Sequence, residues 1–258
     1  MSNPTAYIHP DAKIGNQVTI EPFAYIAKDV VIGDGCWIGP HATIMDGARL
    51  GKNCKIFPGA VVSGIPQDLK FHGEQTTTEI GDNTIIRECV TVNRGTEDRF
   101  KTVLGSNCLL MAYVHIAHDC ILGNHVVLAN SVNLAGHVTI EDYAILEGYV
   151  GVSQFVSIGA HSFVSGQTGV RKNVPPFTKA AREPLQYVGV NSVGLRRRGF
   201  SNDSILQIED IYRTLYVRGL NVTNATAVIE QEAPSSKEKD QILKFIRNST
   251  NGIMRGLS

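Results

Sequence analysis

The sequence has no excess of charge of either sign. Lysine and arginine together number 24, as do aspartate and glutamate, so the formal net charge of the 258-residue chain is zero. A nucleic-acid-binding protein that relies on bulk positive charge would carry a basic excess. The balance argues against that class, although a local basic patch is still compatible with the composition.

Long apolar runs are missing as well. No window approaches the roughly 18 consecutive apolar residues of a membrane-spanning helix, and the N-terminal stretch MSNPTAYIHPDAKIG lacks a basic segment followed by an apolar one. We therefore expect no signal peptide and no stable membrane insertion. Cysteine is scarce, and its number, five, is odd, which favours a reducing compartment. Together these absences predict a cytoplasmic protein.

What the sequence does contain is a repeat of six residues. An aliphatic residue recurs at every sixth position from Ile8 to Ile56 and, after interruptions, from Leu104 to Val164, and a small or β-branched residue follows four positions later. This period fits neither a helix nor a long strand. It fits very short strands joined by tight turns, three to a coil, which stack into a prism with a parallel sheet on each face. Glycine often follows the aliphatic residue, as in IGDG and LGKN, which predicts turns of unusual φ and ψ.

The repeat resembles that of the hexapeptide-repeat family, and the resemblance implies an all-β solenoid, the left-handed parallel β-helix. Four cysteines occupy the small interior position of a hexad, so we expect them to be buried packing residues: Cys36, Cys54, Cys108 and Cys120. Cys89 lies outside that position and has no predicted role.

Two interruptions break the hexads, near residues 62–79 and 98–103. Solenoids carry such insertions as loops on one face, often the binding face. The hexads stop after about Pro176, so we assign residues 1–190 to the β-helix and residues 191–258 to a C-terminal helical domain that covers the last coil. Ser201 is the expected N-cap of a helix that stops at Gly219, and further helices are expected near 222–232 and 235–248.

One coil contains eighteen residues, so residues 18 apart should stack on one another. His118 then lies under Gly136 and Gln154, and Asp119 lies under His137. None of these positions points inward, which predicts an outward-facing polar column along one edge of the prism. We expect His115 at a neighbouring turn.

This column suits acid–base chemistry. The His118 imidazole can accept a proton at neutral pH, and Asp119 can orient it and stabilise its charged form. The backbone N–H of Gly136 can serve a developing oxyanion. Since the column contains no serine or cysteine nucleophile, the pattern favours direct transfer to a hydroxyl or an amine. Three alternatives remain: a zinc site between subunits to which His115, His118 and His137 contribute, a non-catalytic scaffold, and simple solvated histidines.

Three groups of segments resemble the UDP-N-acetylglucosamine O-acyltransferase family: IPQDLKFHGEQTTTEIGDNTIIRE; HIAHDCILGNHVVLAN with LAGHVTIEDYA; and VPPF followed by GVNSVGLRRRGFS. The resemblance implies transfer of an (R)-3-hydroxyacyl group from acyl carrier protein to the 3-hydroxyl of UDP-N-acetylglucosamine, the first step of lipid A biosynthesis. It implies a homotrimer with active sites between adjacent β-helices. No cofactor is implied beyond the phosphopantetheine thioester of the carrier protein.

The resemblance also implies roles for individual residues. His118 is the general base, Asp119 its orienting partner and Gly136 the oxyanion donor. The implied substrate-binding residues are His115 and His137 for the sugar and acyl site, Asp68 and Lys70 with Gln67 for the sugar across a subunit interface, Gln154 for the acetamido group, and Asn191, Arg197 and Arg198 for the nucleotide. Gly166 matches a position that leaves room for a long acyl chain.

The sequence departs from the best-known pattern of this family in several places. Asn93 and Ser153 replace histidines, Val193 replaces a frequent glutamate, and Pro184 replaces a histidine that can close the acyl groove. Acyl length, nucleotide contacts and the acceptance of a 3-amino sugar therefore stay open. The later N-acyltransferase of the same pathway carries an extra domain before its β-helix, for which hexads beginning at Ile8 leave no room. A CoA-dependent hexapeptide acetyltransferase would need neither the long loop nor the arginine cluster.

Overall fold

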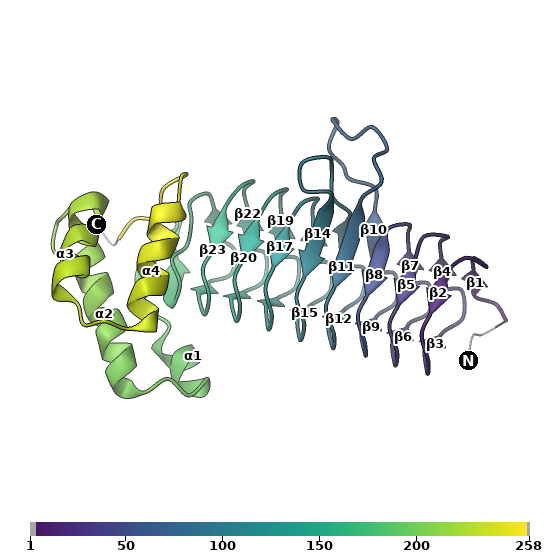
Figure 1. Cartoon of the computed structure of the whole chain (residues 1–258), viewed down its shortest axis with the longest axis horizontal. Coiled ribbons are helices and arrows are strands. Elements are labelled where there is room, and N and C mark those ends of the chain that lie inside the picture. Colours follow the sequence, from purple (N-terminus) through teal and green to yellow (C-terminus); the bar gives the residue numbers. More distant parts are fainter. Residues whose placement is uncertain (1–3, 257–258) are drawn as a thin grey trace.

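The computed structural model describes residues 4–256. Figure 1 shows a long prism of short strands, with the N-terminus at one end and the C-terminal helices packed at the other. The strands form three sheets, and successive strands along the chain pass from the first sheet to the second, then to the third. The left-handed parallel β-helix implied by the hexads and their family is confirmed.

The first sheet has nine strands: β1 (Tyr7–Ile8), β4 (Tyr25–Ile26), β7 (Thr43–Ile44), β10 (Val61–Gly64), β13 (Thr91–Asn93), β16 (His115–Ile116), β19 (Asn133–Leu134), β22 (Gly151–Val152) and β25 (Gly169–Val170). The second has eight: β2 (Lys13–Ile14), β5 (Val31–Ile32), β8 (Ala48–Leu50), β11 (Thr77–Ile80), β14 (Lys101–Leu104), β17 (Ile121–Leu122), β20 (Thr139–Ile140) and β23 (Ser157–Ile158). The third has ten: β3 (Thr19–Ile20), β6 (Trp37–Ile38), β9 (Lys55–Ile56), β12 (Ile85–Ile86), β15 (Leu109–Leu110), β18 (Val127–Leu128), β21 (Ile145–Leu146), β24 (Phe163–Val164), β26 (Thr178–Ala181) and β27 (Gln186–Val190). Neighbouring strands are parallel, except that β26 and β27 pair antiparallel.

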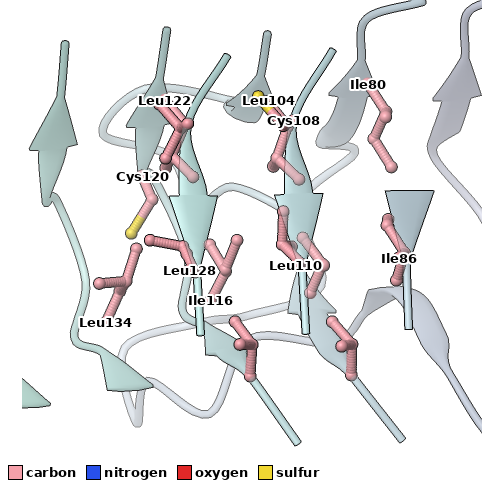
Figure 2. Close-up of a cluster of buried hydrophobic side chains, with 14 of the residues drawn as sticks. Ile80, Ile86, Leu104, Cys108, Leu110, Ile116, Cys120, Leu122, Leu128 and Leu134 are labelled. Atoms are coloured by element: carbon pink, nitrogen blue, oxygen red, sulfur yellow. The ribbon is translucent and has the colours of Figure 1, made fainter. Parts of the chain in front are cut away.

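The core runs the length of the prism and consists of the aliphatic and small residues of the hexads. Figure 2 shows one stretch, in which Cys108 and Cys120 lie among side chains such as Leu122. The prediction that the four interior cysteines are packing residues is confirmed, because each is no more than 1% exposed. Cys89 is exposed.

The expected reason for the turn glycines is wrong. Gly33 and Gly51 do not have positive φ; that conformation belongs to residues two positions after such glycines, for example Asn53 and His125. The glycines are needed because stacked backbones approach closely. A Cβ on Gly33 would lie 2.5 Å from the carbonyl oxygen of Gly51 in the next coil.

The first insertion is shorter than predicted, and the second lies a few residues earlier in the chain. β10 continues to Gly64 and β11 begins at Thr77, so the first loop covers residues 65–76. β14 begins at Lys101, within the predicted second loop, and the actual loop covers residues 94–100. The reason is that β11 and β14 pair over four residues and carry the sheet past the two-residue strands of an ordinary hexad.

Turns join the sheets along three edges of the prism, which we call edge 1–2, edge 2–3 and edge 3–1 after the sheets they connect. Both loops leave edge 1–2, since each joins a first-sheet strand to a second-sheet strand. Figure 1 shows them rising together from the same side of the prism, next to β10, β11 and β14.

The C-terminal helices are α1 (Ser192–Arg197), α2 (Asn202–Tyr216), α3 (Val222–Glu232) and α4 (Lys237–Asn248). Ser201 is the N-cap of α2, as predicted, and its hydroxyl accepts a bond from the N–H of Ser204 at 3.1 Å. The predicted stop at Gly219 is too late: α2 ends at Tyr216, and Gly219 adopts a positive φ in the following loop. The short α1 was not predicted. Within residues 4–256, no helix combines the length and the apolar character needed to cross a membrane.

Candidate active site

A cavity of about 480 Å³ opens on edge 1–2, beneath the loop 65–76. The loop contributes one wall, and turns of three successive coils contribute the other. The lining residues are Gln67, Asp68, Leu69, Lys70, Asn93, Ala117, His118, Ala135, Gly136 and Gln154. Six of the residues that the sequence marked as functional therefore meet in one cavity of one chain. Asp68 and Lys70 lie beside the base of their own chain, and their predicted contact with the sugar across a subunit interface stays a prediction.

His118 and Asp119 form a buried pair at the turn between β16 and β17. The Nδ1 of His118 lies 2.8 Å from Oδ2 of Asp119. The column faces away from the prism interior, but it is not a solvated surface: His118 is 5% exposed and Asp119 is not exposed. The sequence pattern did not predict this burial, because the two loops that cover the pair lie outside the hexads.

Asp119 is held in its charged form. Burial favours the neutral acid, but hydrogen bonds from the hydroxyl of Thr96 and from His118 outweigh that effect, so the pKa of Asp119 lies below its usual value. The carboxylate can therefore keep the proton of His118 on Nδ1 and leave Nε2 free to accept another.

Nε2 of His118 faces the loop 65–76. It lies 3.7 Å from Oδ2 of Asp68, whose other carboxylate oxygen accepts a 2.9 Å bond from the N–H of Lys70. The side chain of Asn93 donates to the carbonyl of Ile65 at the base of the loop. The loop is thus tied to β13 at the point where it presents its carboxylate to the base.

Gly136 lies directly against the imidazole, one coil further on. A Cβ at this position would lie 2.6 Å from Cε1 and 2.7 Å from Nε2 of His118, so only glycine leaves the ring in place. Among the described residues, no acceptor bonds the N–H of Gly136. This amide is therefore available to a substrate oxygen in the cavity.

Of the other two predicted histidines, His137 lies beside the base and His115 does not. His137 packs edge-on against His118 with ring centroids 5.1 Å apart, and burial lowers its pKa. The expectation of His115 at a turn is wrong: it lies in β16 on the outer face of the first sheet, where its Nδ1 is 2.7 Å from the hydroxyl of Thr91. The strand begins one residue before the aliphatic residue of its hexad, Ile116, and therefore includes His115.

The zinc alternative required His115 together with His118 and His137. Within residues 4–256, the possible metal ligands whose donor atoms lie within 4.8 Å of one another are His118, Asp119 and His137. The closest contact among them is the hydrogen bond between His118 and Asp119, and the Asp119 carboxylate is also bonded by Thr96. Within one chain, His115 is not part of this group. The contact between His118 and Asp119 is the one expected of a base and its orienting acid.

The predicted nucleotide residues lie on a different edge of the same chain. Asn191 caps α1 and donates its side-chain N–H to the carbonyl of His161, while Arg198 donates to the carbonyl of Tyr143 and lies over its ring. His161 and Tyr143 are on edge 2–3. Arg197 is exposed on α1.

Gly166 lies on edge 3–1, between β24 and β25. A Cβ on it would approach the carbonyl oxygen of Gly148 at 3.0 Å, so the position has little room for any side chain. The cavity at edge 1–2 is therefore separated from both the arginines and Gly166 by the width of the prism.

Comparison with known proteins places the chain among acyltransferases. Residues 173–254 match the family described as UDP-N-acetylglucosamine O-acyltransferase, domain 2, and residues 29–64 and 101–136 match the bacterial transferase hexapeptide. The chain is 56% identical, over 96% of its length and 94% of the relative, to the acyl-[acyl-carrier-protein]–UDP-N-acetylglucosamine O-acyltransferase of Chlorobium phaeobacteroides. The corresponding protein of Chlorobaculum parvum is 52% identical over 97% of this chain and 95% of its own.

Solved structures agree with these sequence matches. A UDP-N-acetylglucosamine acyltransferase from Bacteroides fragilis superposes with a TM-score of 0.98 at 49% identity, covering 99% of this chain and all of its own. An enzyme of the same name from Francisella novicida gives 0.96 at 40% identity, covering 99% of this chain and 94% of its own.

Proposed function

The chain belongs to the acyl-[acyl-carrier-protein]–UDP-N-acetylglucosamine O-acyltransferase family and is an enzyme of that class, and we propose that His118 is the general base of its reaction. The acyl group is an (R)-3-hydroxyacyl chain, the donor is its thioester on acyl carrier protein, and the acceptor is the 3-hydroxyl of UDP-N-acetylglucosamine. The observation that carries this proposal is the buried His118–Asp119 pair, whose free Nε2 faces a cavity.

The reaction is a single direct transfer. His118 Nε2 takes the proton of the 3-hydroxyl as its oxygen attacks the thioester carbon. The C–S bond then breaks, and the departing pantetheine sulfur receives that proton from the imidazolium. Asp119 fixes the tautomer and stabilises the imidazolium while it exists. A covalent acyl-enzyme is not needed, since the cavity is lined by neither serine nor cysteine among the described residues.

Two further groups support the transition state. The N–H of Gly136, which bonds no described acceptor, donates to the oxyanion that forms on the thioester carbonyl. Asp68 lies on the far side of Nε2 and accepts from a sugar hydroxyl, while Lys70 and Gln67 from the same loop and Gln154 from the coil beyond line the sugar site. A 3-amino sugar nucleotide would place its amine against the same base. An activity assay must therefore decide whether the acceptor atom is oxygen or nitrogen.

The assembly we propose is a homotrimer in the cytoplasm. In one chain the base lies on edge 1–2, whereas Arg198 lies on edge 2–3 and Gly166 on edge 3–1. Edges of one prism cannot meet, but threefold packing brings different edges of neighbouring prisms together. Exposed tyrosines on edge 3–1, Tyr113 and Tyr149, supply apolar surface for such packing. The arginines of α1 then bind the diphosphate at the site of a neighbour, with no cofactor required.

Mixed trimers test whether a site is shared between subunits. We expect that a His118→Ala chain and an Arg197→Met/Arg198→Met chain, each inactive alone, recover about a quarter of wild-type activity when refolded together in equal amounts. The reason is that three quarters of randomly assembled trimers are mixed, and each has about one intact site in three. Separately assembled trimers that are mixed afterwards are the control and stay inactive. No recovery after co-refolding would show that both groups act within one chain.

The reaction itself is tested by product mass. The protein is offered 3-hydroxyacyl carrier proteins of several chain lengths with UDP-N-acetylglucosamine, and in parallel acyl-CoA donors and a 3-amino acceptor. We expect a mono-acylated sugar nucleotide from the carrier-protein donor, and the chain length that gives the most product identifies the preferred acyl group. Product from CoA donors alone, or none from any donor, would overturn the proposal.

A further inference from the structure

The loop 94–100 has no role in the reaction described so far, yet it holds the acid of the catalytic pair. Thr96, which is 7% exposed, makes two hydrogen bonds to the Asp119 carboxylate: its N–H donates to Oδ1 at 3.0 Å and its hydroxyl to Oδ2 at 2.6 Å. Arg99 adds a longer N–H bond to Oδ1 at 3.3 Å, and its guanidinium donates to the Asp119 carbonyl at 2.8 Å.

These bonds select one of two histidines. Oδ2 of Asp119 is 2.8 Å from Nδ1 of His118 but also 3.9 Å from Nε2 of His137. Rotation of the carboxylate about its Cβ–Cγ bond would move Oδ2 relative to both rings. Because Thr96 bonds both oxygens, it fixes the carboxylate plane in the orientation that serves His118.

We propose that Thr96 is a positioning residue for acyl transfer, whose hydroxyl holds the Asp119 carboxylate on His118 and away from His137. The inference rests on the proposed role of His118 as base. The hydroxyl of Thr96 is also the strongest influence that lowers the pKa of Asp119 against the effect of its burial. Other charged or titratable groups around the carboxylate include His118, His137, Arg99 and Cys120. His137 has a second acidic neighbour, since its Nδ1 lies 3.0 Å from Oδ2 of Asp98.

Substitution of Thr96 separates this role from a structural one. Thr96→Val removes the hydroxyl and keeps the shape and the backbone N–H, and we expect kcat to fall about 10- to 100-fold, as for loss of a hydrogen bond to a charged group. KM for UDP-N-acetylglucosamine should stay within about twofold, because Thr96 does not line the cavity. Thr96→Ser restores the hydroxyl and should restore most of kcat. Thr96→Ala serves as the second variant if the valine variant fails to fold.

Two further measurements decide the outcome. Nitrogen-15 NMR of the histidines should find His118 protonated on Nδ1 in the wild type and a mixture of tautomers in the Thr96→Val protein, a readout independent of turnover. In a His118→Ala background, Thr96→Val should cause no further loss. A wild-type kcat in Thr96→Val, or an unchanged His118 tautomer, would refute the positioning role. A wild-type enzyme inactive with every donor would instead refute the proposed function.

Discussion

Replacing His118 with alanine should lower kcat by about 10²- to 10⁴-fold, the range expected when a general base is lost. Asp119 is a poor substitute for the lost base, because it is buried and hydrogen-bonded on both oxygens. The affinity for UDP-N-acetylglucosamine should change far less than kcat, because the base acts mainly in the transition state. Steady-state kinetics with the carrier-protein donor measure both quantities.

A matched control is available in His41. This exposed histidine stacks on Phe23 near the N-terminal end of the prism, far along the chain from the cavity, and His41→Ala should retain wild-type kcat. Circular dichroism and gel filtration of both variants check that the β-helix and its assembly persist. Near-normal turnover in a folded His118→Ala protein would eliminate His118 as the base.

Gly136→Ala should cause a loss of about 100-fold in kcat without unfolding the protein. The new methyl group would lie 2.6–2.7 Å from two atoms of the His118 ring, closer than real side-chain contacts, so the ring must move. A shift of about 1 Å in a catalytic group is enough to cost this much. Since alanine keeps the backbone N–H, the substitution tests the position of the base and not the oxyanion bond.

A double-variant cycle identifies the cause. If the methyl group acts only by displacing the imidazole, Gly136→Ala should have almost no effect in a protein that already carries His118→Ala, where the ring is absent. A full additional loss in that background would mean that the alanine disturbs the oxyanion amide or the fold. Kinetics of the wild type, both single variants and the double variant complete the cycle.

The periodic part of the protein was predictable to the level of individual neighbours. With parallel strands stacked in register, a residue lies against the one that follows it by one coil, and His115 pairs with Asn133 in that way. The same register, counted along the sequence, places His118 against Gly136. The prediction succeeded because every coil without an insertion contains eighteen residues, so the separation of two residues in the sequence determines whether they stack.

The eighteen-residue spacing does not hold across the two insertions, and these insertions contribute residues that contact His118 and Asp119. Thr96 bonds Asp119 across 23 residues instead of 18, so the stacking rule does not find it. The rule likewise does not place Asp68 against His118, because the position of a loop depends on its packing against β13 and not on a period. The interruption of the hexads marked the first loop as a candidate binding loop, but only the resemblance to a family gave roles to its residues.

The sequence by itself determined the solenoid, its interior and the column that contains the base, because the hexads repeat a local rule. The tertiary structure decided three further properties: the burial of His118 and Asp119 under two loops, the hydrogen bonds from Thr96 to the Asp119 carboxylate, and the separation of the base from Arg198 on different edges. Each depends on which non-periodic segments pack together, and the free energy of that packing comes from contacts between residues far apart in the chain.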